Sequence, residues 1–297
     1  LKDRDDIRFA IDHEVDYVAL SFVREASDVE ELRQLLGRKQ NTIKVIAKIE
    51  DQSGVDNIHD IVEVADGVMV ARGDLGIETN IADLPNVQRR IVHASAVGGK
   101  RCIVATHLLE SMIDNPIPTR AEVTDVANAV YEGVDAVMLS GETSVGEYPI
   151  RCVDQLVEIT KRAEKYAGLG YEKELIPKSD KEHVAIHAVA LAESLKARGI
   201  IVITRRGIMA DYVTSARPHS VPIFAFTNNS ATRRRLALNR SVFSFRIPFS
   251  SDPEKTLKSA LNMLKRKRQF DATDKVVVIS DVLADTPSDA IQIRSVN

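Results

Sequence analysis

The sequence has 297 residues, 44% of them hydrophobic and 28% charged, which is usual for a globular protein. Its 40 basic and 43 acidic side chains give a net charge of −3, so no overall positive field favours nucleic acid or an anionic membrane. Low cysteine use, no apolar run of ~18 residues and no signal-like N-terminus favour the cytoplasm. Cys102 and Cys152 lie in apolar runs and are expected to be buried, inert thiols. Leu1 in place of Met leads us to expect part of a longer chain.

The first 167 residues alternate between apolar β runs and segments of helical period. Strands are predicted at 16–22, 43–50, 67–71, 102–108 and 135–141, and helices at 1–16, 26–39, 53–64, 84–99, 118–133 and 149–167. Ser53 is the expected N-cap of the helix that it opens. Nearly continuous apolar strands indicate a parallel sheet covered on both sides. The pattern fits either part of a (β/α)8 barrel or an open doubly wound sheet.

Residues 168–182 mix Gly, Pro and charge without any period, and they form the predicted linker. After the linker, strands are predicted at 199–205, 222–227, 241–247, 275–281 and 290–294, alternating with helices at 183–197, 207–216, 230–239 and 253–269. The sequence therefore predicts two domains, 1–167 and 183–297, and the second is an α/β domain with its own core.

Charged residues gather where two neighbouring strands are predicted to end. Lys48 and Glu50 share one face of their strand, and the run Arg72, Gly73 and Asp74 follows the next strand. The carboxyl ends of parallel strands are the usual ligand-binding edge of α/β folds. Glu50 and Asp74 offer oxygen ligands for Mg²⁺, beside a lysine that can neutralise a phosphoryl group. The competing interpretations are a structural ion pair and an ordinary loop.

Polar residues also follow the later strands. Thr106 is either a catalytic hydroxyl or a local partner of the backbone. His107 is expected to point away from the Thr106 face, in the core or behind the site. Ser140 and Glu142 bring a hydroxyl and a carboxylate to the end of the fifth strand.

The segments IKVIAKIE, MVARGDLG, ATHLLESM, NPIPTRAE, DVANAV and MLSGET together resemble the pyruvate kinase family, in the order and spacing of that family. The resemblance covers residues 1–167, and residues 183–297 resemble the C-terminal domain of the family. It implies an α/β fold: a partial TIM (β/α)8-type barrel of about five β/α units, then a three-layer α/β domain. It also implies a cytoplasmic, allosteric enzyme of glycolysis that uses Mg²⁺ or Mn²⁺ with K⁺, converts phosphoenolpyruvate and ADP to pyruvate and ATP, and assembles as a homotetramer.

The resemblance assigns roles to individual residues of this sequence. Lys48 matches the lysine that stabilises the transferring phosphoryl group and the enolate oxygen. Glu50 and Asp74 match the ligands of the divalent metal. The amides of Gly73 and Asp74 and the hydroxyl of Thr106 match groups that hold the substrate carboxylate.

Other assignments concern the edges of the site and the second domain. Arg72 is expected among the substrate-binding residues, and Ser140 and Glu142 match residues near the region of proton delivery. A possible effector loop contains four residues: Thr204, Arg205, Arg206 and Gly207. This loop has fewer hydroxyls than regulated members of the family, which counts against activation by a sugar phosphate.

The match begins just before the fourth barrel strand of the family. The first three strands and the lid domain, which carry the K⁺ ligands and much of the nucleotide site, have no counterpart in these residues. The chain by itself is therefore expected to be inactive. Two alternatives stay open: a Mg²⁺-dependent barrel lyase acting on oxo-acid enolates, and a non-catalytic module that binds an effector or a partner.

Overall fold

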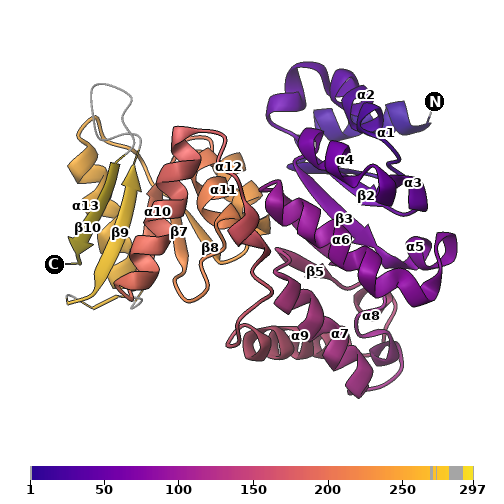
Figure 1. Ribbon diagram of the computed structural model, residues 1–297. Coiled ribbons are helices and arrows are strands. Elements are labelled where there is room, and N and C mark those ends of the chain that lie inside the picture. Colours follow the sequence, from indigo (N-terminus) through magenta and orange to yellow (C-terminus); the bar gives the residue numbers. More distant parts are fainter. Residues whose placement is uncertain (1, 268–269, 272, 281–289, 297) are drawn as a thin grey trace. The chain divides into compact units, whose positions relative to one another are not determined.

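The computed structural model describes residues 2–267, 270–271, 273–280 and 290–296. The chain divides into two compact units, Leu1–Leu175 and Ile176–Asn297, and each unit contains one sheet (Figure 1). The division falls inside residues 168–182, and the 3-10 helix η4 (Tyr171–Glu174) belongs to the first unit. In the described part of the chain, no helix is long and apolar enough to cross a membrane.

The sheet of the first unit is parallel, and its strands lie in the order of the sequence. They are β1 (Tyr17–Leu20), β2 (Lys44–Ile49), β3 (Gly67–Ala71), β4 (Arg101–Ala105) and β5 (Ala136–Met138). Right-handed crossovers between strands whose order never reverses put the connecting helices on one face. A doubly wound sheet would reverse its strand order, so the observed order identifies part of a barrel wall and confirms the predicted fold class.

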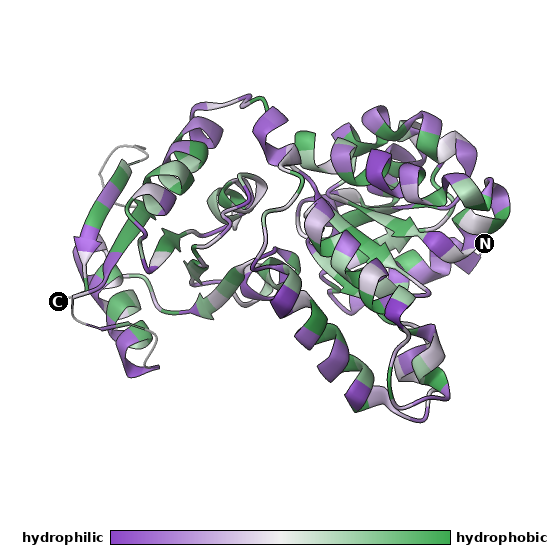
Figure 2. Ribbon diagram, turned by 60° about the horizontal axis from the view of Figure 1, so that its bottom comes forward, coloured by the Kyte–Doolittle hydropathy of each residue, from purple (hydrophilic) through white to green (hydrophobic). Residues whose placement is uncertain are grey.

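The helices of the first unit cover that face as a row of neighbours. The row consists of α1 (Lys2–Asp12), α2 (Ala26–Leu36), α4 (Ile58–Val64), α6 (Leu84–Val97), α7 (Arg120–Glu132) and α9 (Pro149–Ala163). Helix α1 packs against α2, α2 against α4, α4 against α6, α6 against α7 and α7 against α9. Figure 2 shows the hydrophobic strands of this unit beside helices that carry both polar and apolar residues. Further helices outside this row are η1 (Gly37–Asn41), α3 (Gln52–Asp56), α5 (Arg72–Glu78), η2 (Ile81–Asp83), η3 (Glu110–Ile113) and α8 (Gly141–Ser144).

Alternation along β2 separates the core from the site. Val45, Ala47 and Ile49 are buried in the cluster between sheet and helices. Successive side chains along a strand point to opposite faces, so Lys48 lies on the face away from this cluster, and its side chain is 24% exposed. Both cysteines are buried and free, as the sequence predicts.

One local prediction for the first unit is wrong, and one competing interpretation, an ordinary loop after β3, is excluded. The helix after β2 is capped by Asp51, whose Oδ1 accepts the Gly54 N–H at 2.9 Å, and not by Ser53. The segment after β3 is not an open loop, because Arg72 is the first residue of helix α5. In both places the short polar residues are compatible with a cap or with a turn, and tertiary packing decides between the two.

The second unit is a three-layer domain, as the sequence predicts. Its strand order is β10-β9-β6-β7-β8, with β10 antiparallel to β9 and the other neighbours parallel. The strands are β6 (Gly199–Ile203), β7 (Ile223–Thr227), β8 (Val242–Arg246), β9 (Lys275–Ser280) and β10 (Ala290–Ser295). The helices are α10 (Asp180–Ser194), α11 (Ile208–Ser215), α12 (Ser230–Arg235), η5 (Leu236–Leu238) and α13 (Pro253–Arg266). Residue 281 of a predicted strand and residues 268–269 of a predicted helix lie outside the described residues.

Alternate residues of its central strand face two different cores. Ile200 and Val202 lie in the cluster with α10 and α11, and Ile201 and Ile203 lie in the cluster with α13. Helices therefore cover both faces of this sheet, which explains why the sequence of β6 is apolar throughout.

Candidate active site

Lys48 and Glu50 form an ion pair at the carboxyl end of β2. The Lys48 Nζ lies 2.7 Å from Glu50 Oε1 and also donates to Ser21 Oγ at 2.8 Å. Glu50 Oε2 accepts the Phe22 N–H at 2.6 Å, and the Glu50 side chain is only 1% exposed. A buried carboxylate needs such partners. The Lys48 side chain is 24% exposed, so the lysine is the member of the pair that reaches solvent directly.

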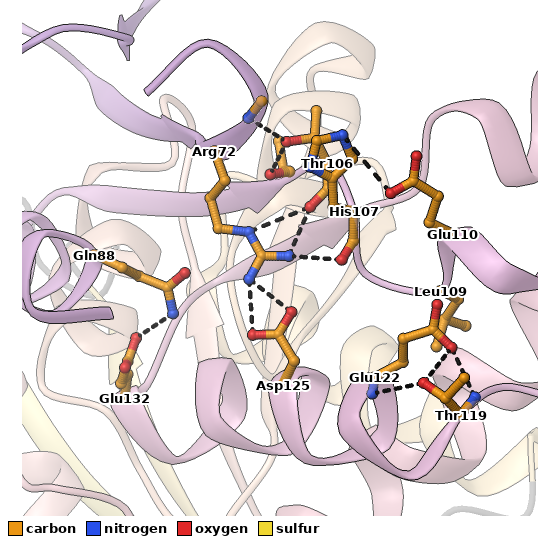
Figure 3. A network of polar contacts seen from close by, with 12 residues as sticks. Arg72, Gln88, Thr106, His107, Leu109, Glu110, Thr119, Glu122, Asp125 and Glu132 are labelled. Atoms are coloured by element: carbon orange, nitrogen blue, oxygen red, sulfur yellow. Dashed lines mark hydrogen bonds and ion pairs between the residues drawn. The ribbon is translucent and has the colours of Figure 1, made fainter. Parts of the chain in front are cut away.

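Arg72, at the start of α5, is buried at the carboxyl end of β3. Its Nη1 contacts both carboxylate oxygens of Asp125 at 2.7 Å. Its Nε and Nη2 donate to the Thr106 carbonyl at 3.2 and 2.6 Å, and Nη2 also donates to the His107 carbonyl at 3.1 Å (Figure 3). The arginine therefore joins α5 and α7 to the segment that follows β4.

Two successive residues after β4 adopt left-handed backbone angles although neither is glycine. The φ angles are +70° at Thr106 and +52° at His107. Such a conformation costs about 1–3 kcal/mol per residue and persists where the surroundings determine it. The strand ends at Ala105, so its period of two no longer applies, and the prediction of a core position for His107 is wrong: its side chain is 57% exposed, 3.8 Å from Glu110.

The Thr106 hydroxyl lies against the backbone of the neighbouring strand end. It donates to the Ala105 carbonyl at 2.6 Å and accepts the Gly73 N–H at 2.9 Å. Thr106 and Gly73, which the sequence analysis placed in one substrate site, are therefore in direct contact.

Asp74 occupies the first turn of α5 with an exposed side chain. Its carboxylate has no hydrogen bond or ion pair to any residue that the structure describes. No three His, Cys, Asp or Glu side chains come together as a metal site in that part of the chain. A hard cation held by Glu50 and Asp74 would therefore complete its shell with oxygens of water and substrate, which is how Mg²⁺ is commonly bound.

The Glu142 carboxylate accepts hydrogen bonds from two backbone N–H groups. Its side chain is buried, Oε1 accepts the Leu109 N–H at 3.0 Å and Oε2 accepts the Ser140 N–H at 2.7 Å. The carboxylate thus ties the turn after β5 to the segment after β4. Ser140 is the N-cap residue of α8 and follows β5.

Glu122 fixes the beginning of α7. Its carboxylate accepts the N–H and hydroxyl of Ser111 at 2.7 and 2.6 Å, and those of Thr119 at 2.7 and 2.9 Å. Burial raises the pKa of Glu122, but these hydrogen bonds outweigh burial and hold the pKa below its usual value. The sequence predicts a helix over 118–133, and the structure adds a capping box at its start, whose Glu122 also holds the loop after β4.

Sequence reasoning missed Ser21 and Asp125 at this edge. Ser21 follows β1 directly, so the rule that strand ends carry ligand groups could have found it. Asp125 lies in the middle of α7, 53 residues from Arg72, and no local pattern connects the two.

The possible effector loop of the second unit follows β6. The Thr204 hydroxyl oxygen accepts the Gly207 N–H at 3.1 Å, and Gly207 has a left-handed φ of +91°. The Arg205 guanidinium lies 5.6 Å from the centre of the Phe249 ring, and Arg205 and Arg206 are exposed.

Comparison with known families decides the assignment. Residues 1–153 match the family model described as pyruvate kinase, barrel domain, and residues 182–293 match the one described as pyruvate kinase, alpha/beta domain. The chain belongs to the pyruvate kinase family. The resemblance of the sequence motifs to this family is thereby confirmed.

Individual relatives agree with the family models. The pyruvate kinase of Dictyostelium discoideum is 42% identical over 302 residues, covering 99% of this chain and 59% of the relative. The chloroplastic pyruvate kinase isozyme G of Ricinus communis is 44% identical, covering 90% of this chain and 64% of the relative. The pyruvate kinase of Clostridium perfringens is 39% identical, covering 93% and 60%. The chain thus spans about 60% of the length of these pyruvate kinases.

Proposed function

We propose that the site at the ends of β2, β3 and β4 transfers a phosphoryl group between phosphoenolpyruvate and ADP, with pyruvate and ATP as products. The observation that carries this proposal is the solvent-reaching Lys48 on its buried partner Glu50. Strands β2, β3 and β4 are parallel neighbours, so their carboxyl ends share one edge of the sheet. The contact between Gly73 and Thr106 lies at that same edge.

Lys48 would stabilise the negative charge that develops on the phosphoryl group during transfer. The phosphoryl group spreads negative charge over its oxygens during transfer, and a fixed ammonium stabilises that charge without reorganisation. Glu50 orients Lys48, because its buried Oε1 lies 2.7 Å from the Lys48 Nζ. The same ammonium is suited to the enolate oxygen that remains after the phosphoryl group leaves.

Glu50 and Asp74 fit a divalent cation by their chemistry. Each carboxylate oxygen has two lone pairs, so Glu50 keeps acceptor capacity beyond Lys48 and Phe22, and the Asp74 carboxylate is exposed. Mg²⁺ or Mn²⁺ bound there would supply positive charge to the phosphate and carboxylate of the substrate. The K⁺ that the family uses is part of the proposal without assigned ligands.

The substrate carboxylate would bind to the amides of Gly73 and Asp74 and to the Thr106 hydroxyl. In the structure the Thr106 hydroxyl oxygen accepts the Gly73 N–H. A bound carboxylate oxygen would take that place, and the hydroxyl would turn from the Ala105 carbonyl toward the substrate. Ser140 and Glu142 are assigned to the region of proton delivery, with Glu142 fixing the backbone of Ser140.

The test compares the chain with Lys48→Ala, and with Lys161→Ala on the exposed surface of α9 as matched control. Binding of phosphoenolpyruvate with Mg²⁺ is measured by calorimetry, and pyruvate formation by a lactate dehydrogenase-coupled assay with ADP and K⁺. We expect Lys48→Ala to weaken binding and to lower any ADP-dependent turnover at least ~100-fold. Equal binding and turnover in Lys48→Ala would refute the role of Lys48.

The same assays separate the two alternatives from the proposal. Pyruvate formed without ADP would favour the lyase, and tight metabolite binding without turnover would favour the non-catalytic module. The turnover assay also tests the expectation that these 297 residues are inactive alone. If there is no turnover, the binding measurement still tests the role of Lys48.

The second unit is proposed to carry regulation and assembly. Strands β7 and β9 lie on opposite sides of β6, so the loop after β6 stands where the strand order reverses, a preferred ligand position in open α/β sheets. Arg205 and Arg206 in this loop suit a phosphate-bearing effector. A homotetramer and a cytoplasmic location complete the proposal, although the relative from Ricinus communis is described as chloroplastic.

A further inference from the structure

The Arg72 guanidinium has no donor to offer a substrate. Arginine carries five N–H groups in a planar fork. The structure gives this side chain five contacts: two to the Asp125 carboxylate, two to the Thr106 carbonyl and one to the His107 carbonyl (Figure 3). With a side chain only 8% exposed, Arg72 is committed to the protein, and a substrate could reach it only by breaking one of these contacts.

We propose that Arg72 and Asp125 are positioning residues for the Thr106 hydroxyl. In this account Asp125 orients the guanidinium, and the guanidinium holds the carbonyls of Thr106 and His107 in their left-handed turn. This turn places the Thr106 hydroxyl against the Gly73 N–H. The contact lies where we propose that the substrate carboxylate binds. The inference rests on the proposed function for the identity of the ligand, and on geometry alone for the positioning.

The backbone at Thr106 explains why such a device is needed. A β-branched residue is strained in the left-handed region, so the turn relaxes unless its surroundings hold it. The two carbonyls point toward one guanidinium, whose rigid fork fixes both directions at once. A lysine at position 72 would place a single point charge there and could not define both.

The position of Asp125 makes the pair a link between elements. Asp125 is on α7, Arg72 begins α5, and Thr106 follows β4, so the pair connects three segments that are distant in the sequence. The start of α7 is itself held to the loop after β4 by Glu122 and Ser111. Asp125 therefore lies on a helix whose position relative to that loop is fixed by the Glu122–Ser111 hydrogen bonds.

Hydrogen exchange of the Gly73 amide tests the positioning without any ligand. This N–H is bonded to the Thr106 hydroxyl, so its protection reports where that hydroxyl lies. We expect Asp125→Asn to speed exchange at Gly73 about tenfold, equal to about 1.4 kcal/mol at 25 °C. Thr106→Val, which removes the hydroxyl and keeps the shape, gives the upper limit of the effect.

Controls separate positioning from general loosening. The Ser140 amide, bonded to Glu142 in the same unit, should keep its rate in Asp125→Asn within about twofold. Asp154→Asn, the same chemical change on the exposed surface of α9, should alter neither amide. Unchanged exchange at Gly73, or equal acceleration at Gly73 and Ser140, would overturn the proposal.

A second variant covers the case in which Asp125→Asn does not fold. Asp125→Glu keeps the negative charge, so Arg72 is not left unpaired, but its longer side chain displaces the guanidinium. We expect Gly73 exchange in Asp125→Glu to lie between the unsubstituted chain and Thr106→Val. A rate equal to that of the unsubstituted chain would show that the geometry of the pair does not matter, and would overturn the proposal.

Ligand binding then links the pair to the proposed function. Calorimetry with phosphoenolpyruvate and Mg²⁺ should show about tenfold weaker binding to Asp125→Asn and unchanged binding to Asp154→Asn. If the unsubstituted chain does not bind phosphoenolpyruvate, the proposed function fails for this chain, and the Gly73 rates still decide the positioning. Binding unchanged in Asp125→Asn despite a mobile Gly73 would overturn the part of the proposal that concerns the substrate.

Discussion

Asp66 is the residue of the first unit whose charge we expect to matter most for stability. It precedes β3, and its carboxylate accepts from Arg33 Nη2 at 2.8 Å, Lys44 Nζ at 2.8 Å and the Val45 N–H at 2.9 Å. Burial raises the pKa of Asp66, but Lys44, the Val45 N–H and Arg33 outweigh it, so the net pKa lies below its usual value. The three contacts join α2 and β2 to the start of β3.

Asp66→Asn removes the charge and keeps the shape. Two charge-assisted hydrogen bonds are lost, each contributing about 1.5–3 kcal/mol when buried. The Arg33 and Lys44 side chains are 24% and 35% exposed, so water compensates part of this, and we expect a loss of about 2–3 kcal/mol. With a urea m-value of ~2–3 kcal/mol/M, the unfolding midpoint falls by about 1 M.

Thiol labelling measures unfolding of the first unit alone, because Cys102 and Cys152 are both buried there. Asp154→Asn is the matched control. A group with a lowered pKa contributes stability above its unfolded pKa of about 3.9, and that contribution is lost as the pH falls through the folded pKa. The difference between Asp66→Asn and the control should therefore shrink below about pH 4, measured by circular dichroism. A midpoint equal to that of the control at pH 7, or a penalty that persists in acid, would refute this reasoning.

Two further substitutions follow the same logic. Burial raises the pKa of Glu193, but hydrogen bonds from Ser220 and from the His219 N–H outweigh burial and lower the pKa overall. Glu193→Gln should therefore destabilise the second unit by about 1–2 kcal/mol near pH 7 and by less below about pH 4. Denaturation monitored by circular dichroism measures both values. Glu142→Gln can accept only one of the N–H groups of Leu109 and Ser140, so it should cost about 1–3 kcal/mol by thiol labelling; an unchanged midpoint would show that this carboxylate is not holding the backbone.

The sequence predicts the strands well because they consist of apolar runs; in the second unit helices cover both faces of the sheet. The periodicity alone could not choose between a barrel and a doubly wound sheet, because that choice depends on strand order; the resemblance to the family motifs indicated the barrel. Lys48 and Glu50 were predictable as neighbours because the period of a strand fixes their common face. Their ion pair at 2.7 Å agrees with that prediction.

The parts of the site that sequence reasoning missed depend on contacts between distant segments. The left-handed turn at Thr106 and His107 contains no glycine that would indicate it in the sequence, and the guanidinium that contacts its carbonyls comes from another strand end. Asp125 looks like any polar residue on a helix until Arg72 is placed opposite it. Helix α5 excludes the competing interpretation of an ordinary loop. Its Leu75 packs into the core, and local residue preferences say nothing about that packing.

The central claim is that phosphoenolpyruvate and a divalent cation bind at the ends of β2 and β3. A crystal structure of the 297-residue chain with phosphoenolpyruvate and Mn²⁺ tests it directly, because anomalous scattering locates the metal. We expect Mn²⁺ on Glu50 and Asp74, the phosphate beside Lys48 and the carboxylate on the Gly73 amide. A metal peak away from Glu50 and Asp74, or a ligand carboxylate that leaves the Gly73 N–H on the Thr106 hydroxyl, would contradict it.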